Sequence, residues 1–220
     1  TITAILFSFN LLAAPLSLGF GPGIRKEVKS FKDMRQENVV SQSLDFSCGP
    51  AALATVLSYY FEDEVSEKEI INFLLLNTSL AKVKAKKGFS LLDLKNFATY
   101  RGYEVKGFRM DFEFLVGLDK PVLLPVNIKD YSHFVIFRGI SGDRVFLADP
   151  ALGNMTMKTD KFQSMWQAGI GLVLSKADHD PEGAPLAVSE EERAVFADSQ
   201  NVRKIFGINN IGPIYSSGEF

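Results

Sequence analysis

A single cysteine heads the chain's candidate catalytic groups. Cys48 is followed by Gly49-Pro50 and by residues 51–60, AALATVLSYY, which form helices well. Because proline is favoured in the first helical turn, we expect a helix to begin near Cys48. The unpaired N–H groups and the dipole at that end of a helix stabilise a thiolate, which is the nucleophilic form of cysteine. The alternative is a buried cysteine without a chemical role.

His133 is the better of the two histidines as a proton donor and acceptor for that thiolate. It opens an apolar segment, 133–140, whereas His179 lies in an acidic stretch typical of a solvated loop. A histidine beside a thiolate forms an ion pair with it and protonates the leaving amine. Taken alone, His133 fits a core histidine with one backbone hydrogen bond at least as well.

Asp149 is placed to orient such a histidine. It ends segment 144–149, which the turn at Ser141-Gly142-Asp143 joins to the segment that starts at His133. Antiparallel strands bring the start of one beside the end of the next, so the carboxylate can hold the imidazole in the required tautomer. An ordinary strand-ending turn is the simpler explanation for Asp149-Pro150.

Gln42 lies six residues before Cys48. Its amide and the Cys48 backbone N–H are the types of donor that stabilise the oxyanion of a tetrahedral intermediate. A glutamine upstream of a cysteine is a weak signal by itself and is more often a surface residue.

The elements that must position these groups change type along the chain. Ser66 and Ser90, each followed three positions later by an acidic residue, predict helices over 70–76 and 94–101. The second half predicts a short helix over 160–167 and strands over 103–110, 122–128, 133–140, 144–149 and 170–174. Helices followed by an antiparallel sheet indicate the α+β class, with Cys48 on the helical half and His133 on the sheet half.

Composition narrows the function. The chain has 220 residues, of which 46% are hydrophobic and 23% charged, and this excludes a disordered protein. The formal net charge of -2 gives no electrostatic footprint for nucleic acid. One cysteine excludes an internal disulfide and a multi-thiolate metal site, and we expect neither a metal nor an organic cofactor.

Three regions differ in composition: residues 1–24, 25–176 and 177–220. Residues 1–24 carry no charge. They fit either a buried helix or strand of the domain or the hydrophobic region of a signal peptide cleaved before Phe20, and we expect the signal peptide. An uncleaved anchor is the second possibility, and both predict a periplasmic protein. We expect 25–176 to be the folded domain. We expect 177–220 to be an acidic extension, loosely packed or used for a partner, with Ser189 and Glu192 capping a helix through Phe196.

Three segments together resemble the C39 family of papain-like cysteine peptidases over about residues 39–175. They are QSLDFSCGPAAL (42–53), HFVIF (133–137) and VFLADPALG (145–153). The resemblance implies a papain-like fold in which a helical half carrying the cysteine packs on an antiparallel sheet carrying the histidine. It also implies that Cys48 is the nucleophile and His133 the general acid–base, with Asp149 orienting His133 and Gln42 in the oxyanion hole.

The resemblance also suggests a substrate class. Well-known members of the family cleave leader peptides after a double glycine, as the N-terminal domain of an ABC exporter. This sequence shows no transporter spans and no nucleotide-binding domain, so we expect no ATP. Free-standing exported members resemble accessory peptidases of surface-protein secretion systems. The expected partners are therefore a protein or peptide substrate with a Gly-rich cleavage site, for example a functional amyloid, and a secretion-system component.

Two other functions remain open at this point. A non-catalytic, chaperone-like module of the same fold would bind Gly-rich segments for a secretion pore. An acyl transferase would use the same thioester, because transfer and hydrolysis differ only in the nucleophile of the second step.

Overall fold

A helical half precedes the strands along the chain, as the sequence predicts, and two short helices of the described residues lie between strands. The computed structural model describes residues 31–128, 131–166, 168–177 and 183–194, without the side chains of residues 31, 32 and 34. The helices are α1 (Phe31–Gln36), α2 (Cys48–Tyr59), α3 (Glu67–Leu75), α4 (Leu80–Ala85), α5 (Leu91–Tyr100), α6 (Phe112–Gly117) and α7 (Thr159–Met165). The strands are β1 (Glu104–Arg109), β2 (Val122–Ile128), β3 (Tyr131–Ser141), β4 (Arg144–Asp149), β5 (Gly153–Lys158) and β6 (Ile170–Ser175).

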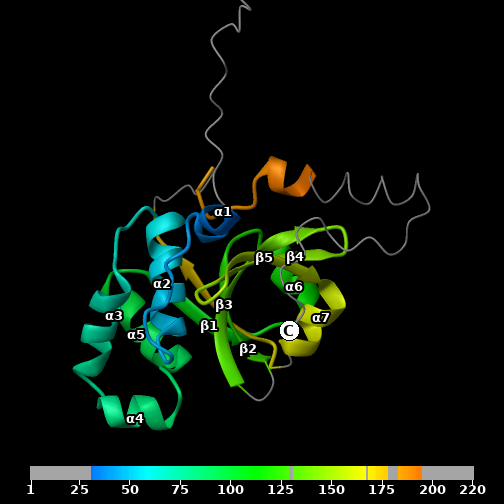
Figure 1. Ribbon diagram of the computed structural model, residues 1–220. Coiled ribbons are helices and arrows are strands. Elements are labelled where there is room, and N and C mark those ends of the chain that lie inside the picture. Colours follow the sequence, from blue (N-terminus) through cyan, green and yellow to red (C-terminus); the bar gives the residue numbers. More distant parts are fainter. Residues whose placement is uncertain (1–30, 129–130, 167, 178–182, 195–220) are drawn as a thin grey trace, which may run out of the picture.

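The strands form one antiparallel sheet in the order β1-β6-β2-β3-β4-β5. Helices α2, α3 and α5 form a layer on one face of this sheet, and α6 and α7 lie on the other face (Figure 1). Each face has its own cluster of buried apolar side chains, so the sheet is covered on both sides. The prediction of an α+β fold with a helical half and an antiparallel sheet is confirmed.

Helix α2 is the central element of the helical layer. Its first ten residues, Cys48 to Leu57, are all buried, and the small side chains of Ala51, Ala52 and Ala54 are fully shielded from solvent. A helix that is apolar on all sides has to be surrounded by protein. Helix α2 packs against β3, α3 and α5, which fixes the direction from which Cys48 approaches the sheet.

Local sequence signals predicted most of these elements. The Ser90 side chain and the Asp93 carboxylate form the predicted reciprocal cap of α5, and Ser66 caps α3. Strands β2 and β4 have the predicted bounds. Strand β5 was missed, because GNMTMK contains one β-branched residue and starts with glycine. Helices α1, α4 and α6 were also missed, and each spans only six residues.

The C-terminal extension packs on the domain. Residues 184–193, here called the C-terminal strap, run from the end of α2 to β3. Leu186 is fully buried, and its N–H donates to the Tyr59 carbonyl at 3.0 Å. Ser189 and Glu192 form the predicted cap, and the predicted helix end at Phe196 lies outside the described residues. The expectation of a loosely packed extension is wrong for the strap.

Arg138 on β3 anchors the strap to the sheet. Its side chain is only 5% exposed, and all five of its N–H groups donate at 2.8–3.0 Å. Two go to the Glu192 carboxylate, two to the carbonyls of Leu186 and Ala187, and one to the Asn154 side chain. A buried guanidinium is costly unless it is paired in this way, so β3 and the strap depend on each other.

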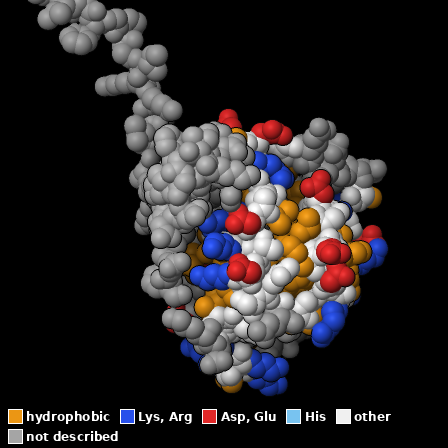
Figure 2. All heavy atoms as spheres, turned by 90° about the vertical axis from the view of Figure 1, so that its right-hand side faces the viewer, with side chains coloured by type: hydrophobic (Ala, Val, Ile, Leu, Met, Phe, Trp, Pro, Cys, Tyr) orange, Lys and Arg blue, Asp and Glu red, His pale blue; other side chains and the backbone are white. Residues whose placement is uncertain are grey.

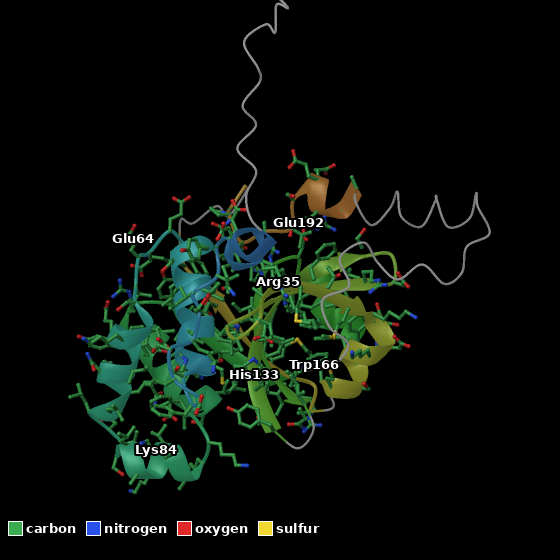
Figure 3. All side chains as sticks on the ribbon, in the orientation of Figure 1. Arg35, Glu64, Lys84, His133, Trp166 and Glu192 are labelled. Atoms are coloured by element: carbon green, nitrogen blue, oxygen red, sulfur yellow. The ribbon has the colours of Figure 1, made fainter. Side chains whose placement is uncertain are left out.

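The N-terminal segment holds the other side of the same region. Gly153 begins β5 with φ 83°, and a Cβ there would overlap the backbone carbonyl of Arg35. The Asn154 side chain donates to the Glu37 carbonyl at 2.7 Å, and Asn38 donates to the Pro185 carbonyl at 3.1 Å. Figure 3 marks the two segments by Arg35 and Glu192. Both therefore close around the turn that follows Asp149.

Within the described residues, no helix is long and apolar enough to span a bilayer. The predicted signal segment, residues 1–24, lies outside them.

Leu186→Ala should lower the free energy of unfolding by about 2–4 kcal/mol, because the substitution leaves a cavity at a fully buried site. Urea denaturation followed by circular dichroism measures the change. Leu92→Ala is the matched control, since that leucine is 63% exposed, and it should change the free energy by less than about 0.5 kcal/mol. Equal effects of the two substitutions would show that the strap is not part of the cooperative unit.

Candidate active site

Cys48 is the first residue of α2, as predicted. Its side chain is buried and the thiol is free. The hydroxyl of the preceding Ser47 is bonded to the N–H and the carbonyl of Leu44, and it does not cap α2. The first N–H groups of this 12-residue helix are therefore left without a side-chain cap at the end that carries Cys48.

Gly49 allows the helix to approach β3. A Cβ at this position would lie 3.1 Å from ring atoms of Phe134 and equally close to the Leu94 side chain. Phe134 directly follows His133 on β3, so this contact brings Cys48 to the strand that carries the histidine. Figure 3 shows His133 on the sheet, where α2 packs.

The structure brings His133 and Asp149 together. The His133 Nε2 lies 2.9 Å from Asp149 Oδ1, and the two residues are only 6% and 2% exposed. Because Asp149 occupies Nε2, Nδ1 is the ring nitrogen left for the hydrogen bond between His133 and the Cys48 sulfur. The hairpin of β3 and β4 creates the predicted juxtaposition.

The Asp149 carboxylate is itself held by the backbone. Its Oδ1 accepts the N–H groups of Ala151 at 2.7 Å and Leu152 at 3.2 Å, in addition to the bond with His133. Bonds from backbone N–H groups stabilise the ionised carboxylate and fix its direction. The Asp149 carboxyl group thus has a fixed orientation at the buried end of the imidazole.

The surroundings of His133 favour its protonated form. Burial lowers the pKa of His133, but the hydrogen bonds and charges of Asp149 and Cys48 outweigh it and raise the pKa to about 9. The imidazolium therefore stabilises the folded state below about pH 6.5, and this contribution is lost as the pH rises through about 9. Near neutral pH the ring is charged and faces the sulfur, which is the arrangement of an ion pair.

Gln42 lies next to the Asp149 turn. Its backbone N–H donates to the Pro150 carbonyl at 2.9 Å, and its side-chain Nε2 donates to the Leu44 carbonyl at 3.1 Å. The second N–H of the amide is not used in that bond, and the Oε1 is buried without a partner. The segment before Cys48 is therefore tied to the segment after Asp149, and the Gln42 amide sits in that junction.

Two positioning contacts were not predicted from the sequence. Glu67 in the first turn of α3 is buried, and it accepts the N–H and the hydroxyl of Ser43 at 2.9 and 2.6 Å. The Tyr131 hydroxyl donates to the Asp45 carbonyl at 2.8 Å, and its ring centroid lies 6.3 Å from that of His133. Burial, followed by the charges of Cys48 and Asp45, raises the pKa of Tyr131. Both contacts join segments that are distant in the sequence. The only signal in the sequence is the presence of Ser43 near Cys48 and of Tyr131 near His133.

The described residues contain no group of three or more His, Cys, Asp or Glu side chains that could hold a metal ion. The chemistry of the site is that of a thiol, an imidazole and a carboxylate in a row.

Comparison with known sequences decides the family. The sequence pattern of the Peptidase C39 family matches residues 36–179, which include all four predicted site residues. The chain belongs to the Peptidase C39 family. It is therefore a cysteine peptidase, as its sequence motifs predict.

Two relatives of this C39 peptidase carry the same description, "Probable functional amyloid protease FapD". The protein of Pseudomonas fluorescens is 34% identical over 181 residues, which are 79% of this chain and 80% of the relative. The protein of Pseudomonas aeruginosa is 31% identical over 195 residues, which are 86% of this chain and 85% of the relative. The similarity extends beyond the peptidase domain of this chain.

Solved structures share the fold of this C39 peptidase. The peptidase domain of Streptococcus ComA, a bifunctional ABC transporter, matches with a TM-score of 0.53 at 23% identity, covering 62% of this chain and 96% of that domain. A double-glycine motif protease from an AMS/PCAT transporter, solved with a leader peptide, matches with a TM-score of 0.51 at 26% identity. That match covers 64% of this chain and 94% of the protease. The predicted fold is confirmed.

The His133 side chain should titrate close to pH 9 in solution, because Asp149 and Cys48 stabilise the imidazolium. The chain has two histidines, so proton–carbon NMR spectra show two imidazole Hε1 signals, which a His179→Asn variant assigns. Asp149→Asn should move the midpoint of His133 down by about one unit or more, toward 6.5. A midpoint near 6.5 in the unmodified protein would contradict the ion pair.

Proposed function

We propose that this C39 peptidase cleaves peptide bonds with Cys48 as the nucleophile, His133 as the general acid–base and Asp149 as the group that orients His133. The observation that carries the proposal is the buried row of the three side chains, with Nε2 of His133 on Asp149 and the other ring nitrogen left for the Cys48 sulfur. Family membership supports the reaction type.

The acylation step follows from this geometry. The Cys48 thiolate attacks the carbonyl carbon of the scissile bond, and the carbonyl oxygen becomes an oxyanion. The His133 imidazolium gives its proton to the leaving nitrogen as the C–N bond breaks. The amine product leaves, a thioester joins Cys48 to the acyl product, and His133 is neutral. The fixed Asp149 carboxylate keeps the ring in the tautomer that this transfer needs.

Hydrolysis of the thioester reverses the proton transfer. Neutral His133 takes a proton from a water molecule as the water oxygen attacks the thioester carbonyl. The C–S bond then breaks, the acid product leaves, and the thiolate–imidazolium pair is restored. The pair favoured by the raised pKa of His133 is therefore both the starting and the final state of the cycle.

Gln42 and the Cys48 backbone N–H form the oxyanion hole in this proposal. The backbone bond from Gln42 to Pro150 and the bond from its amide to Leu44 hold the side chain near the start of α2. The amide N–H left over from the Leu44 bond is the donor available to the oxyanion.

The proposed biological role is processing of a secreted surface protein, such as a functional amyloid subunit, in the periplasm. The resemblance to two FapD proteins over about four fifths of the chain supports it, as does the apolar, uncharged sequence of residues 1–24. The double-glycine protease among the structural neighbours supports a Gly-rich cleavage site. A component of the secretion machinery is the second proposed partner.

Cys48→Ala should lower peptidase activity by more than ~10³-fold, because the nucleophile is lost. The folded state should survive, since the substitution removes one buried sulfur atom. Mass spectrometry of surface proteins from cells that carry the unmodified or the Cys48→Ala protein is the readout. A defined new terminus that appears only with the unmodified protein names the substrate.

Asp149→Asn tests the orienting role of Asp149 in the same assay. It should slow turnover and leave residual activity, because orientation of His133 is lost while the nucleophile remains. A Cys48→Ala protein that is folded and still generates the same termini would exclude Cys48 as the nucleophile. The absence of any new terminus even in cells that carry the unmodified protein would favour the non-catalytic module.

Gln42→Ala should lower kcat by ~10²-fold and leave KM nearly unchanged, because an oxyanion donor acts on the transition state more than on the bound substrate. Steady-state kinetics on a cleaved peptide measure both constants. Ser41→Ala is the control, since its exposed hydroxyl bonds only to the neighbouring Gln36 side chain among the interactions recorded. A rise in KM with kcat unchanged would place Gln42 in substrate binding instead.

A further inference from the structure

A cavity of about 470 Å³ opens beside the catalytic row. Two of its lining residues adjoin the site: Phe46 lies two residues before Cys48, and the Tyr131 ring packs near the His133 ring. The other lining residues are Ser43, Leu44, Asp45, Lys84 and Lys87. A substrate whose carbonyl carbon reaches the Cys48 sulfur therefore has neighbouring groups within reach of this cavity.

The two lysines come from a segment of one charge sign. Residues 78–90, TSLAKVKAKKGFS, contain four lysines and no acidic residue. All four lysine side chains are exposed, and among the described residues no ion pair is recorded for any of them. Figure 3 shows Lys84 on α4, at the lower edge of the helical layer. Positive charge is thus concentrated in a chain whose net charge is -2.

Packing fixes this segment against the cysteine loop. Phe89 and Phe46 have ring centroids 6.4 Å apart, and a Cβ on Gly88 would lie 3.5 Å from the Phe46 carbonyl. Val83 on α4 is buried in the same apolar cluster as Phe89. The backbone that carries Lys84 and Lys87 is therefore packed beside the cavity that their side chains line.

We propose that Lys84 and Lys87 determine specificity by selecting substrates with an acidic side chain close to the scissile bond. This inference rests on the proposed peptidase function. Asp45 also lines the cavity, so the three charged lining residues carry one net positive charge, to which Lys82 on α4 and Lys86 directly after α4 add. An opposite charge in the substrate is attracted to such a patch and a like charge is repelled, which affects both association and discrimination.

Alkylation of Cys48 measures the electrostatic effect of Lys84 and Lys87 at the sulfur without any peptide substrate. Cys48 is the single cysteine, so the modification rate reports on one site. Iodoacetate is anionic and iodoacetamide is neutral, and the ratio of their rate constants measures the positive potential at the sulfur. The unmodified protein is compared with Lys84→Glu/Lys87→Glu. The ratio should fall by about fivefold in the variant at low ionic strength, and the difference should shrink in high salt.

Lys158→Glu/Lys161→Glu is the matched control with the same change in net charge. In the β4–β5 register Lys158 lies opposite Arg144, which is at the other end of β4 from Asp149. The side chains of Lys158 and Lys161 are both exposed. Figure 2 shows the face that is on the right in Figure 1, where α7 lies, and there basic and acidic side chains are interspersed. This control should leave the ratio unchanged. An equal fall in the two variants, or no fall in Lys84→Glu/Lys87→Glu, would overturn the proposal.

Peptide cleavage tests the selection itself. Short synthetic peptides with a central Gly-Gly and either Glu, Gln or Lys at one nearby position are compared by kcat/KM. The unmodified protein should prefer Glu over Gln over Lys, and Lys84→Glu/Lys87→Glu should reverse that order. Equal values of kcat/KM for the Glu, Gln and Lys peptides would overturn the proposal. If no peptide is cut while Cys48 is alkylated normally, the peptidase function fails instead, and the alkylation ratio still reports on the lysines.

Discussion

The approach of α2 to β3 at Gly49 is the contact on which the site depends. The thiol comes from the helical layer and the imidazole from the sheet, so neither half contains the chemistry alone. The missing side chain of Gly49 leaves room for the ring of Phe134, which would lie only 3.1 Å from a Cβ there, and so permits the close approach of the two layers beside the sulfur. A Cβ at residue 49 would lie 3.1 Å from the side chains of Phe134 and Leu94, so the groups beside the sulfur would have to shift by a few tenths of an ångström to admit it.

Charges alternate along that row, and each is compensated by its neighbours. The backbone N–H groups after Asp149 hold the carboxylate, the carboxylate holds the imidazolium, and the imidazolium faces the sulfur at the start of α2. Burial strengthens every one of these interactions, because little water competes. The same burial would make any one of the charges costly if its partner were removed. The site is therefore preorganised by electrostatics as much as by packing.

Local signals in the sequence predicted the features that depend on residues close together in the chain. The Ser90–Asp93 cap, the turn at Ser141 and the order of site residues all depend on neighbours in the chain, and they identified the helices, the hairpin and the family. The bond between Ser43 and Glu67 and the clamp on Arg138 join segments far apart in the sequence. No local pattern encodes such pairs, and the strap was misjudged as loose because the whole extension, 177–220, is acidic in composition. Strand β5 escaped notice because its own residues carry little strand signal, whereas its pairing with β4 is visible only in the structure.

The position of the strap in the chain affects when the domain can finish folding. A ribosome or a translocation pore releases the chain from its N-terminus, so β3 emerges well before Leu186 and Glu192. Until then, Arg138 lacks four of its five acceptors, and the end of α2 at Tyr59 is uncovered. Final closure of the sheet layer thus waits for the last described residues, although the nucleophile is among the first to emerge. Pairing of the buried Arg138 guanidinium is coupled in this way to the emergence of the strap.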